Sequence, residues 1–296
     1  MIYIVCTSGF HRALAGEISK KQSKPCTIVS LDKSFSWGGK FFNICKAIPL
    51  LIRCGLDRDS YAIVPHPFNP WFSLFVFFSK GCSIFDDGIA YYYDAKIPDN
   101  LFCRIYLLIA YRINREVSPD HIGKVTFLEY LKSSTVDFYY SVYPNMSSVE
   151  SSKVVAVRPE QAGRCEGEGI NIFLDTHSQV AAHVSELDIV EYFNARYLED
   201  EFETLYYKPH PRSPSKISQL LSTQSWAQEI NEDYEVLIGS SRVSRLYSIY
   251  SSAALITKIM QPESSVYCFT NDSLIGSVGR LQVLFECENV EFIRVA

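Results

Sequence analysis

Short apolar runs that end in polar loops alternate with segments of helical spacing along this chain. In the first half the apolar runs are IYIVC (2–6), CTIVSL (26–31), YAIVP (61–65) and CSIF (82–85). Helices are expected between these runs, from about Ala13, over FFNICKAIPLLIRCG (41–55) and over 71–78. This β-α-β-α order predicts a parallel sheet with helices on both faces.

The same order restarts in the second half. Helical segments near 101–115 and 123–133 and strands at 136–141 and 153–157 come before RPEQAGRCEGEG (158–169), which is polar and rich in glycine. We interpret 158–169 as a linker between an N-terminal domain (1–157) and a C-terminal domain (170–296). The second domain is expected to contain a helix over 186–202 and strands in INIFLD (170–175), ETLYYKPHP (203–211), YEVLIG (234–239), LYSIY (246–250), VYCFT (266–270) and VEFIRV (290–295). Two such α/β halves predict a ligand cleft between them, at the carboxyl ends of the strands.

Charge and cysteine content narrow the function classes. The net charge of −5 argues against a nucleic-acid partner, because such binding rests mainly on Lys and Arg that neutralise phosphates. The nine cysteines are scattered without a CxxC pair, so reduced and mostly buried thiols are expected. Met1 leads into IYIVC without the features of a secretory signal, which predicts a cytoplasmic protein.

The most apolar segments are WFSLFVFF (71–78) and LFCRIYLLIAY (101–111). Both are shorter than the roughly 20 residues that span a bilayer, so core helices are expected. The alternative is an aromatic-rich face that rests on a membrane surface.

An acidic pair, Asp86-Asp87, stands before Gly88 at the end of a predicted strand. A carboxylate there can take the proton of a substrate hydroxyl, and a like-charged neighbour strengthens it as a base. The alternative is a solvated turn, because Asp-Gly is a common turn dipeptide.

The segment YYKPHPR (206–212) offers a second candidate. Pro209 and Pro211 keep His210 out of a helix, while Lys208 and Arg212 add positive charge beside it. In such a setting an imidazole can meet a phosphate, as donor or as acid. A rigid exposed loop with a packed histidine is the alternative.

Ser251-Ser252, before AALITKIM, has the pattern of a helix N-cap. Free amides at that end, together with two hydroxyls, form an anion site, although a cap without a ligand is the commoner case. The loop Asp175–Ser178 is unusually polar and is a further candidate for contact with a ligand. At His66-Pro67, packing is favoured over stacking on a sugar.

Several familiar signatures are missing or weak. There is no GxGxxG and no GxxxxGK[ST], and no clustered metal-ligand pattern, so neither a nucleotide cofactor nor a metal is predicted. Asp57-Arg58-Asp59 is formally a DxD, but it follows the CG that ends a predicted helix, and we interpret it as a solvated loop.

The order of these motifs resembles the bacterial sialyltransferases of lipooligosaccharide, O-antigen and polysialic-acid synthesis. The matching residues are Asp86-Asp87-Gly88, then Lys208 with His210-Pro211, and about forty residues later Ser251-Ser252. The resemblance implies a GT-B fold, with two Rossmann-like α/β domains facing across a cleft. It also implies an enzyme of surface-glycan synthesis, in the cytoplasm or in peripheral contact with the inner membrane.

The resemblance assigns roles to these residues. Asp87 would be the general base for the acceptor hydroxyl, with Asp86 and Gly88 in support. His210 would contact the CMP phosphate, and Lys208, Pro211, Ser251 and Ser252 would help to bind the CMP-sugar donor. A single base fits direct displacement with inversion. The acceptor would be a glycan or glycolipid, with candidate contacts in Thr7–Arg12, Trp37–Gly39 and His66–Trp71.

Two alternatives stay open. One is a different donor, either another CMP-activated acidic sugar such as Kdo or a UDP- or GDP-sugar. The other is a non-catalytic glycan-binding partner of polysaccharide assembly.

Overall fold

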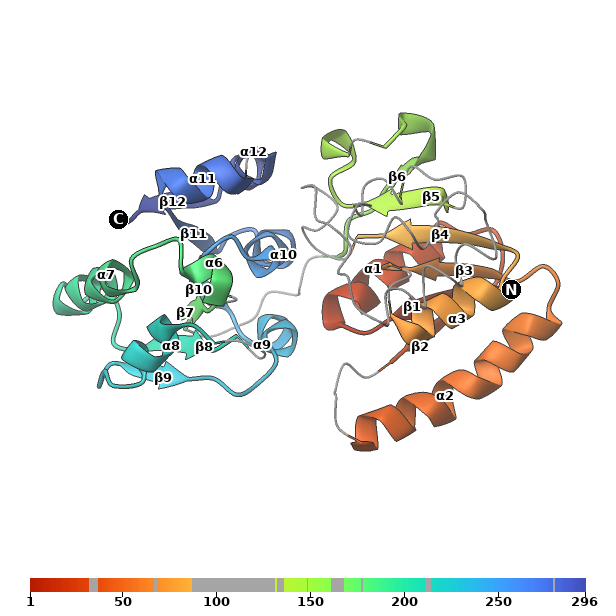
Figure 1. Ribbon diagram of the computed structural model, residues 1–296, viewed down its shortest axis with the longest axis horizontal. Helices are drawn as coiled ribbons and strands as arrows, with labels where there is room; N and C mark the ends of the chain where they lie inside the picture. The colour runs from red at the N-terminus through yellow and green to blue at the C-terminus, as the bar shows by residue number, and fades with distance from the viewer. Residues whose placement is uncertain are drawn as a thin grey trace. The chain divides into compact units, whose positions relative to one another are not determined.

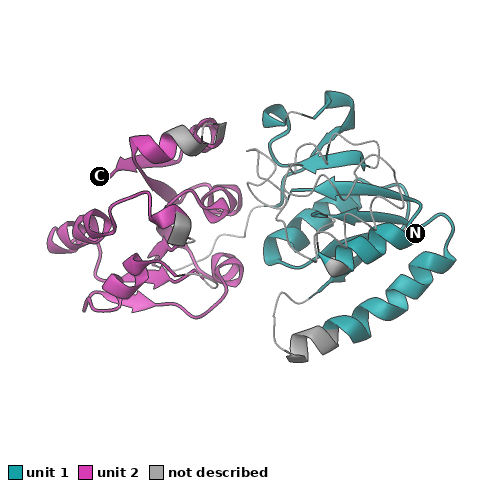
Figure 2. Ribbon diagram, viewed as in Figure 1, with its two compact units in different colours: residues 1–160 teal, residues 161–296 magenta. Residues whose placement is uncertain are grey.

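The structure, a computed structural model, describes residues 1–31, 37–66, 69–86, 131, 136–147, 149–160, 168–176, 178–210, 214–278 and 280–296. The chain divides into two compact units, unit 1 (1–160) and unit 2 (161–296), each with a six-stranded sheet (Figure 2). The boundary falls within the predicted linker 158–169, of which 161–167 lie outside the described residues.

In unit 1 all described strands run parallel, in the order β2-β1-β3-β4-β5-β6 (Figure 1). These strands are β1 (Ile2–Cys6), β2 (Cys26–Ser30), β3 (Tyr61–Val64), β4 (Gly81–Phe85), β5 (Val136–Ser141) and β6 (Val154–Ala156). The helices are α1 (Gly9–Lys20), α2 (Trp37–Leu56) and α3 (Pro70–Phe78), with 3-10 turns at Pro144–Met146 and Ser151–Lys153. The predicted helices near 101–115 and 123–133 lie outside the described residues, apart from Leu131.

β1 lies between β2 and β3 in the sheet of unit 1, and all five of its residues are buried. Tyr3 and Val5 belong to the core cluster beneath α2 and α3, together with Leu51 and Phe75. Side chains alternate between the faces of a strand, so Ile4 points to the opposite face. Burying a side chain of this size contributes about 1.5–3 kcal/mol.

Unit 2 has the strand order β12-β11-β10-β7-β8-β9, again all parallel among the described strands. The strands are β7 (Ile170–Leu174), β8 (Leu205–Lys208), β9 (Ala227–Glu229), β10 (Val243–Ser248), β11 (Ser265–Thr270) and β12 (Glu291–Arg294). The helices are α6 (Ser178–Ala181), α7 (Glu186–Leu198), α8 (Lys216–Leu221), α9 (Tyr234–Ser240), α10 (Ser252–Met260), α11 (Asp272–Val278) and α12 (Arg280–Cys287).

Aromatic rings fill the core between the sheet of unit 2 and α7. Phe193 of α7 lies edge-on to Tyr247 of β10, with ring centroids 5.1 Å apart and planes at 90°. Phe173 of β7 and Phe269 of β11 complete the group around it. Each edge-to-face pair adds about 0.5–1.5 kcal/mol beyond its buried area.

The predicted strand at 234–239 is wrong, because this segment is α9. Its buried residues are Tyr234, Leu237 and Ile238, which follow the i, i+3, i+4 spacing of a helix face. Asp233 occupies the N-cap position and Glu235 the first turn, where negative charge favours a helix. The first helix also begins earlier than predicted, at Gly9, because the Ser8 side chain accepts a hydrogen bond from the His11 N–H and caps it.

Within the described part of the chain, no helix combines the length and apolar character needed to cross a bilayer. Four of the seven described cysteines are buried, Cys6, Cys54, Cys82 and Cys268, and all seven are free thiols.

Candidate functional site

The sheet of unit 2 reverses its direction of growth between β7 and β10. From β7 the chain proceeds to β8 and β9 on one side, whereas β10 leads to β11 and β12 on the other. The loops after β7 and β10 therefore diverge at the carboxyl edge of the sheet. In open α/β sheets, this switch point is the usual ligand-binding position.

Ser251 and Ser252 lie at this switch point, directly after β10. Ser251 is the N-cap of α10, and its Oγ accepts a hydrogen bond from the Ala253 N–H at 3.2 Å. Ser252 is the first helical residue, and both serines are half-buried. The predicted helix cap is confirmed. The first amides of α10 and the partial positive charge of its N-terminus favour an anion at this end.

The turn before Ser251 is held in an unusual conformation by Tyr250. This residue has a φ of 41°, a region that bulky residues rarely adopt. Its N–H donates to the Cys268 sulfur at 3.2 Å, and its ring packs against Phe285 and Phe292. The ring and the N–H together fix the direction in which the chain enters α10.

Lys208 and His210 lie on the other side of β7. Lys208 is the last residue of β8, and both side chains are half-buried. β8 and β10 both pair with β7, so their ends lie roughly 10 Å apart at a strand spacing of 4.7–4.9 Å. Lys208, His210, Ser251 and Ser252 are thus brought to one edge of one sheet. Pro211 lies outside the described residues.

Asp175, between these two loops, is a buried carboxylate saturated with donors. One oxygen accepts from the Thr176 N–H (2.8 Å) and the Ser215 hydroxyl (2.6 Å). The other accepts from the Ser215 N–H (2.8 Å) and the Ser218 hydroxyl (2.7 Å). The Asp175 N–H in turn donates to the Lys208 carbonyl at 3.0 Å. Asp175 therefore fixes both ends of the loop that carries His210.

A buried hydroxyl close to this edge has no hydrogen-bond partner in the described part of the chain. Ser248, the last residue of β10, is fully buried, and its Oγ makes no hydrogen bond to any described residue. The neighbouring Cys268 thiol has its pKa raised to about 12 by burial, so it remains neutral at physiological pH.

In unit 1, Asp86 follows β4 and is almost completely buried. Its N–H donates to the Tyr140 carbonyl at 3.1 Å, and its carboxylate accepts from the Val142 N–H at 2.5 Å and from the Tyr139 hydroxyl. These bonds fasten the end of β4 to β5. Asp87 and Gly88 lie outside the described residues, so the role of Asp87 stays a prediction.

Two histidines lie at the carboxyl edge of the sheet of unit 1. The buried His11 of α1 packs edge-on against Phe85, the residue before Asp86, with centroids 5.4 Å apart. His66, after β3, packs against Phe72 at 5.2 Å, in keeping with the favoured packing interpretation.

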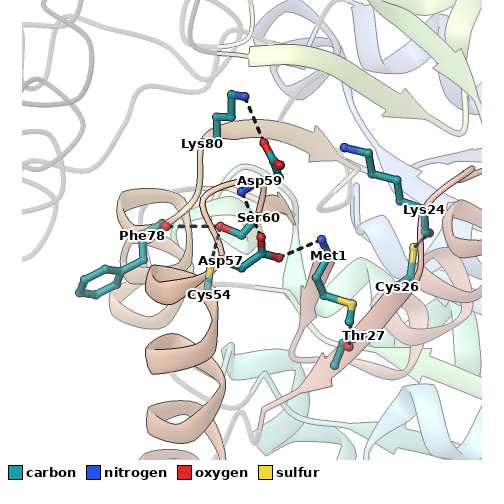
Figure 3. A network of polar contacts seen from close by, with 10 residues as sticks. All are labelled: Met1, Lys24, Cys26, Thr27, Cys54, Asp57, Asp59, Ser60, Phe78 and Lys80. Atoms are coloured by element: carbon teal, nitrogen blue, oxygen red, sulfur yellow. Dashed lines mark hydrogen bonds and ion pairs between the residues drawn. The ribbon is translucent and has the colours of Figure 1, made fainter.

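The Asp57–Asp59 segment is a turn held by contacts within it and with Met1 and Lys80 (Figure 3). The Asp57 carboxylate accepts from the Met1 ammonium and the Asp59 N–H, both at 3.0 Å, while Asp59 pairs with Lys80 at 3.3 Å. The ammonium holds the pKa of Asp57 below its usual range. The predicted solvated loop is confirmed. Among the described residues there is no group of three or more His, Cys, Asp or Glu side chains arranged to hold a metal ion.

No protein-family model matches the sequence, and no curated protein matches it. Solved structures do match. UDP-GlcNAc 2-epimerase from Methanocaldococcus jannaschii, in complex with UDP-GlcNAc and UDP, is 11% identical at a TM-score of 0.53, covering 99% of this chain and 88% of that chain. The chain has a GT-B fold. The predicted class, two Rossmann-like α/β domains of this type, is confirmed.

Two further GT-B structures match at lower scores. UDP-GlcNAc 2-epimerase from Neisseria meningitidis is 13% identical at a TM-score of 0.46, covering 90% of this chain and 82% of that chain. MurG from Acinetobacter baumannii is 10% identical at a TM-score of 0.43, covering 99% of this chain and 85% of that chain.

In unit 2, sequence analysis missed the Asp175–Ser215–Ser218 network and the positive φ of Tyr250. In unit 1 it missed the packing of His11 on Phe85. The Asp175 network had a usable signal. Ser215 follows Pro214 and precedes the apolar Ile217, which is the pattern of an N-cap.

Proposed function

We propose that the protein is an inverting glycosyltransferase that transfers sialic acid from CMP-sialic acid to a hydroxyl of a surface-glycan acceptor. The observation that carries the proposal is in unit 2. His210 and the pair Ser251-Ser252 are the residues predicted from the sequence to contact phosphate. His210 follows β8 and the serine pair follows β10, so both lie at the carboxyl edge of one parallel sheet, on either side of its switch point. This is where a GT-B fold with a nucleotide-sugar donor needs groups that bind phosphate.

The proposed reaction is a single displacement. The acceptor oxygen attacks the anomeric carbon of the donor, the bond from that carbon to the phosphate oxygen breaks, and CMP leaves with the electron pair. Asp87 takes the proton of the attacking hydroxyl. Negative charge grows on the phosphate, where Lys208, His210 and the N-terminus of α10 stabilise it.

The geometry of unit 1 supports a division of roles between the two carboxylates. Asp86 is buried and engaged by the Tyr139 hydroxyl and the Val142 N–H. Asp86 therefore holds the end of β4 in place, and Asp87 is the next residue along the chain. The proposal places proton transfer on Asp87 alone, which agrees with an inverting mechanism.

A donor panel tests the proposal. Purified protein is incubated with CMP-sialic acid, CMP-Kdo, UDP-GlcNAc or a GDP-sugar, with and without EDTA, and release of the free nucleotide is measured. We expect CMP release from CMP-sialic acid in EDTA, at a higher kcat/KM than from any other donor. Preference for CMP-Kdo would show that the proposed sugar is wrong while the proposed CMP site is retained. Preference for a UDP- or GDP-sugar, or glycan binding without turnover of any donor, would overturn the proposal.

Matched histidine variants test the site. We expect His210→Ala to lower kcat/KM by about 10²–10³-fold, as for loss of one group that stabilises a developing anion. His183→Ala is the control, because His183 is an exposed histidine of the same unit, after α6. Equal activity of the two variants would show that His210 has no role in the mechanism.

A further inference from the structure

The hydroxyl of Ser248, the last residue of β10, differs from those of other buried serines in unit 2. Ser248 is 0% exposed, and its Oγ has no hydrogen-bond partner in the described part of the chain. By contrast, the Ser215 hydroxyl donates to the Asp175 carboxylate at 2.6 Å. The Ser264 hydroxyl donates to the Val243 carbonyl at 2.7 Å. A buried hydroxyl without a partner costs free energy and is rare in folded proteins, so a group on a ligand is a candidate partner.

The Ser248 side chain points to the face of the sheet that α10 covers. Successive side chains of a strand point to opposite faces. The preceding residue, Tyr247, packs its ring against Phe193 and Tyr192 of α7, so Ser248 points away from α7. The chain moves from β10 to β11 in the direction opposite to that from β7 to β8, and right-handed crossovers then place α10 and α7 on opposite faces. Figure 1 shows these two helices on opposite sides of β10.

The Ser248 hydroxyl therefore lies beneath the first turn of α10. β10 ends at Ser248 and α10 begins at Ser252, so three residues, 249–251, connect the strand to the helix. α10 packs on β10 and β11. It has nine residues, and the free amides and partial positive charge of its first turn favour an anion. A hydroxyl beneath this turn is a further donor for an oxygen of that anion.

The strand register directs a cationic side chain to the same face. Lys208 pairs with Leu174 of β7, and Leu174 pairs with Ser248. Residues paired in this way across parallel strands point to the same face, so the Lys208 side chain leaves β8 toward the face that carries α10. The Cα atoms of Lys208 and Ser248 are roughly 10 Å apart, which is two strand spacings. A cation and a hydroxyl donor thus stand at one level of the sheet, at its carboxyl edge.

The turn 249–251 carries backbone strain. Tyr250 has a φ of 41°, which is unfavourable for a bulky residue. Its N–H donates to the Cys268 sulfur, which is a weak acceptor. Strained residues of this kind cluster at ligand-binding turns, where a second backbone conformation is accessible. Because the Ser248 hydroxyl is buried, an anion reaches it when this turn shifts, and relief of the strain at Tyr250 favours the shift.

We propose that the Ser248 hydroxyl donates a hydrogen bond to the phosphate of the bound nucleotide. The phosphate binds at the first amides of α10, the turn 249–251 relaxes, and the hydroxyl gains the acceptor that it lacks. Ser248 is then a binding residue of the donor site in addition to Ser251-Ser252. The inference rests on the proposed function in one respect, since it takes a nucleotide phosphate as the anion.

Titration calorimetry with CMP and with cytidine tests the proposal. The two ligands differ by the phosphate alone. Ser248→Ala should bind CMP about tenfold more weakly, as expected for the loss of one hydrogen bond to a charged group, and should bind cytidine like the unchanged chain. Its midpoint of thermal unfolding without nucleotide should be unchanged or higher, because alanine removes a hydroxyl without a described partner. A purely structural residue would not weaken binding while it preserves stability.

The matched control is Ser264→Ala, the same substitution at a buried serine of the same unit. The Ser264 hydroxyl donates to Val243, the first residue of β10, at the opposite end of the strand from Ser248. This control should lower the unfolding midpoint by about 2–4 °C and leave CMP binding unaltered. CMP binding by Ser248→Ala that equals that of the unchanged chain, or that of Ser264→Ala, would overturn the proposal.

A crystal soaked with CMP provides a direct measurement. A phosphate oxygen should lie about 2.5–3.0 Å from the Ser248 Oγ, with a changed backbone conformation at Tyr250. A phosphate bound at α10 without this hydrogen bond would also overturn the proposal.

Failure of the proposed function gives a different result. UMP and GMP are titrated alongside CMP on the same samples. If the unchanged chain binds UMP or GMP more tightly than CMP, the CMP donor of the proposed function is wrong, and the effect of Ser248→Ala on that nucleotide decides whether Ser248 contacts its phosphate. No binding of any of the three nucleotides would overturn both.

Discussion

The carboxylate of Asp175 and the N–H of Ser215 are joined by a 2.8 Å hydrogen bond that closes the loop carrying His210. In Asp175→Asn, an amide NH2 group, which donates hydrogen bonds, would replace one of two carboxylate oxygens that both accept them. We expect a loss of about 2–4 kcal/mol in the free energy of unfolding, because a buried donor then faces another donor. Urea unfolding measures this loss.

Asp188→Asn is the control for that variant, since its carboxylate accepts a single bond at an exposed position, from the Ala296 N–H. It should change stability by no more than about 0.5 kcal/mol. If Asp175→Asn behaves the same way, the loop is held by other contacts.

Ser251→Asp separates the capping role of Ser251 from its proposed contact with phosphate. Asp is as good an N-cap as Ser, so stability should change by only a few tenths of a kcal/mol. CMP should bind at least about tenfold more weakly, because the new carboxylate repels the phosphate. Titration calorimetry with CMP measures the affinity. Ser185→Asp, at the N-cap of α7, makes the same change away from the site and should leave CMP binding unaltered.

A glycine variant is usually less stable than the alanine variant at the same position, and we expect the opposite order at Tyr250. Both replacements remove a buried ring, at a cost of several kcal/mol. At a φ of 41°, however, alanine keeps the backbone strain that glycine relieves, so Tyr250→Gly should be about 1 kcal/mol more stable than Tyr250→Ala. At Tyr247, in the regular strand β10, alanine should be the more stable. The urea midpoints of the glycine and alanine variants at Tyr250 and at Tyr247 give the order of stability at each position. The same order at both positions would contradict a strained turn at Tyr250.

Glu201 should contribute stability that acid removes. Its carboxylate pairs with Arg196 and with Arg245, the latter at 2.6 Å, and the Arg196 guanidinium holds the pKa of Glu201 below its usual range. A depressed folded-state pKa means that the contribution is present above the unfolded pKa of about 4.3 and is lost as pH falls through the folded value. Glu201→Gln should therefore cost about 1 kcal/mol at neutral pH and much less in strong acid. Glu199→Gln, whose Arg196 contact is 3.9 Å long, should have little effect at either pH.

Ser248→Ala should be neutral or stabilising by up to about 1 kcal/mol, because it removes a buried hydroxyl with no described partner. Thermal unfolding without ligand measures this. A clear loss of stability would show that Ser248 does have a partner in the folded chain.

Most strands of both sheets could be predicted from the sequence because buried parallel strands form short apolar runs, such as IYIVC in β1. The edge strand β9 was missed, because its three residues AQE are mostly exposed and form no apolar run. Apolar runs also explain the error at 234–239. A six-residue apolar run is also compatible with a buried helix, and only the positions of Tyr234, Leu237 and Ile238 distinguish the two.

The serine cap of α10 was predictable because a cap is local, with donor and acceptor two residues apart. The Asp175 network was not, because its partners lie 40 and 43 residues further along and are brought together by the sheet. The turn at Tyr250 was hidden for another reason. A positive φ usually indicates glycine or asparagine, and a tyrosine there carries no signal in its residue type.

Each sheet is built from one uninterrupted stretch of chain, since all described strands of the first lie within residues 1–160 and all those of the second within 161–296. No described strand crosses from one sheet to the other. During synthesis the first unit can therefore close its sheet on the ribosome before the second has been translated, and its apolar strands need not wait exposed for later segments.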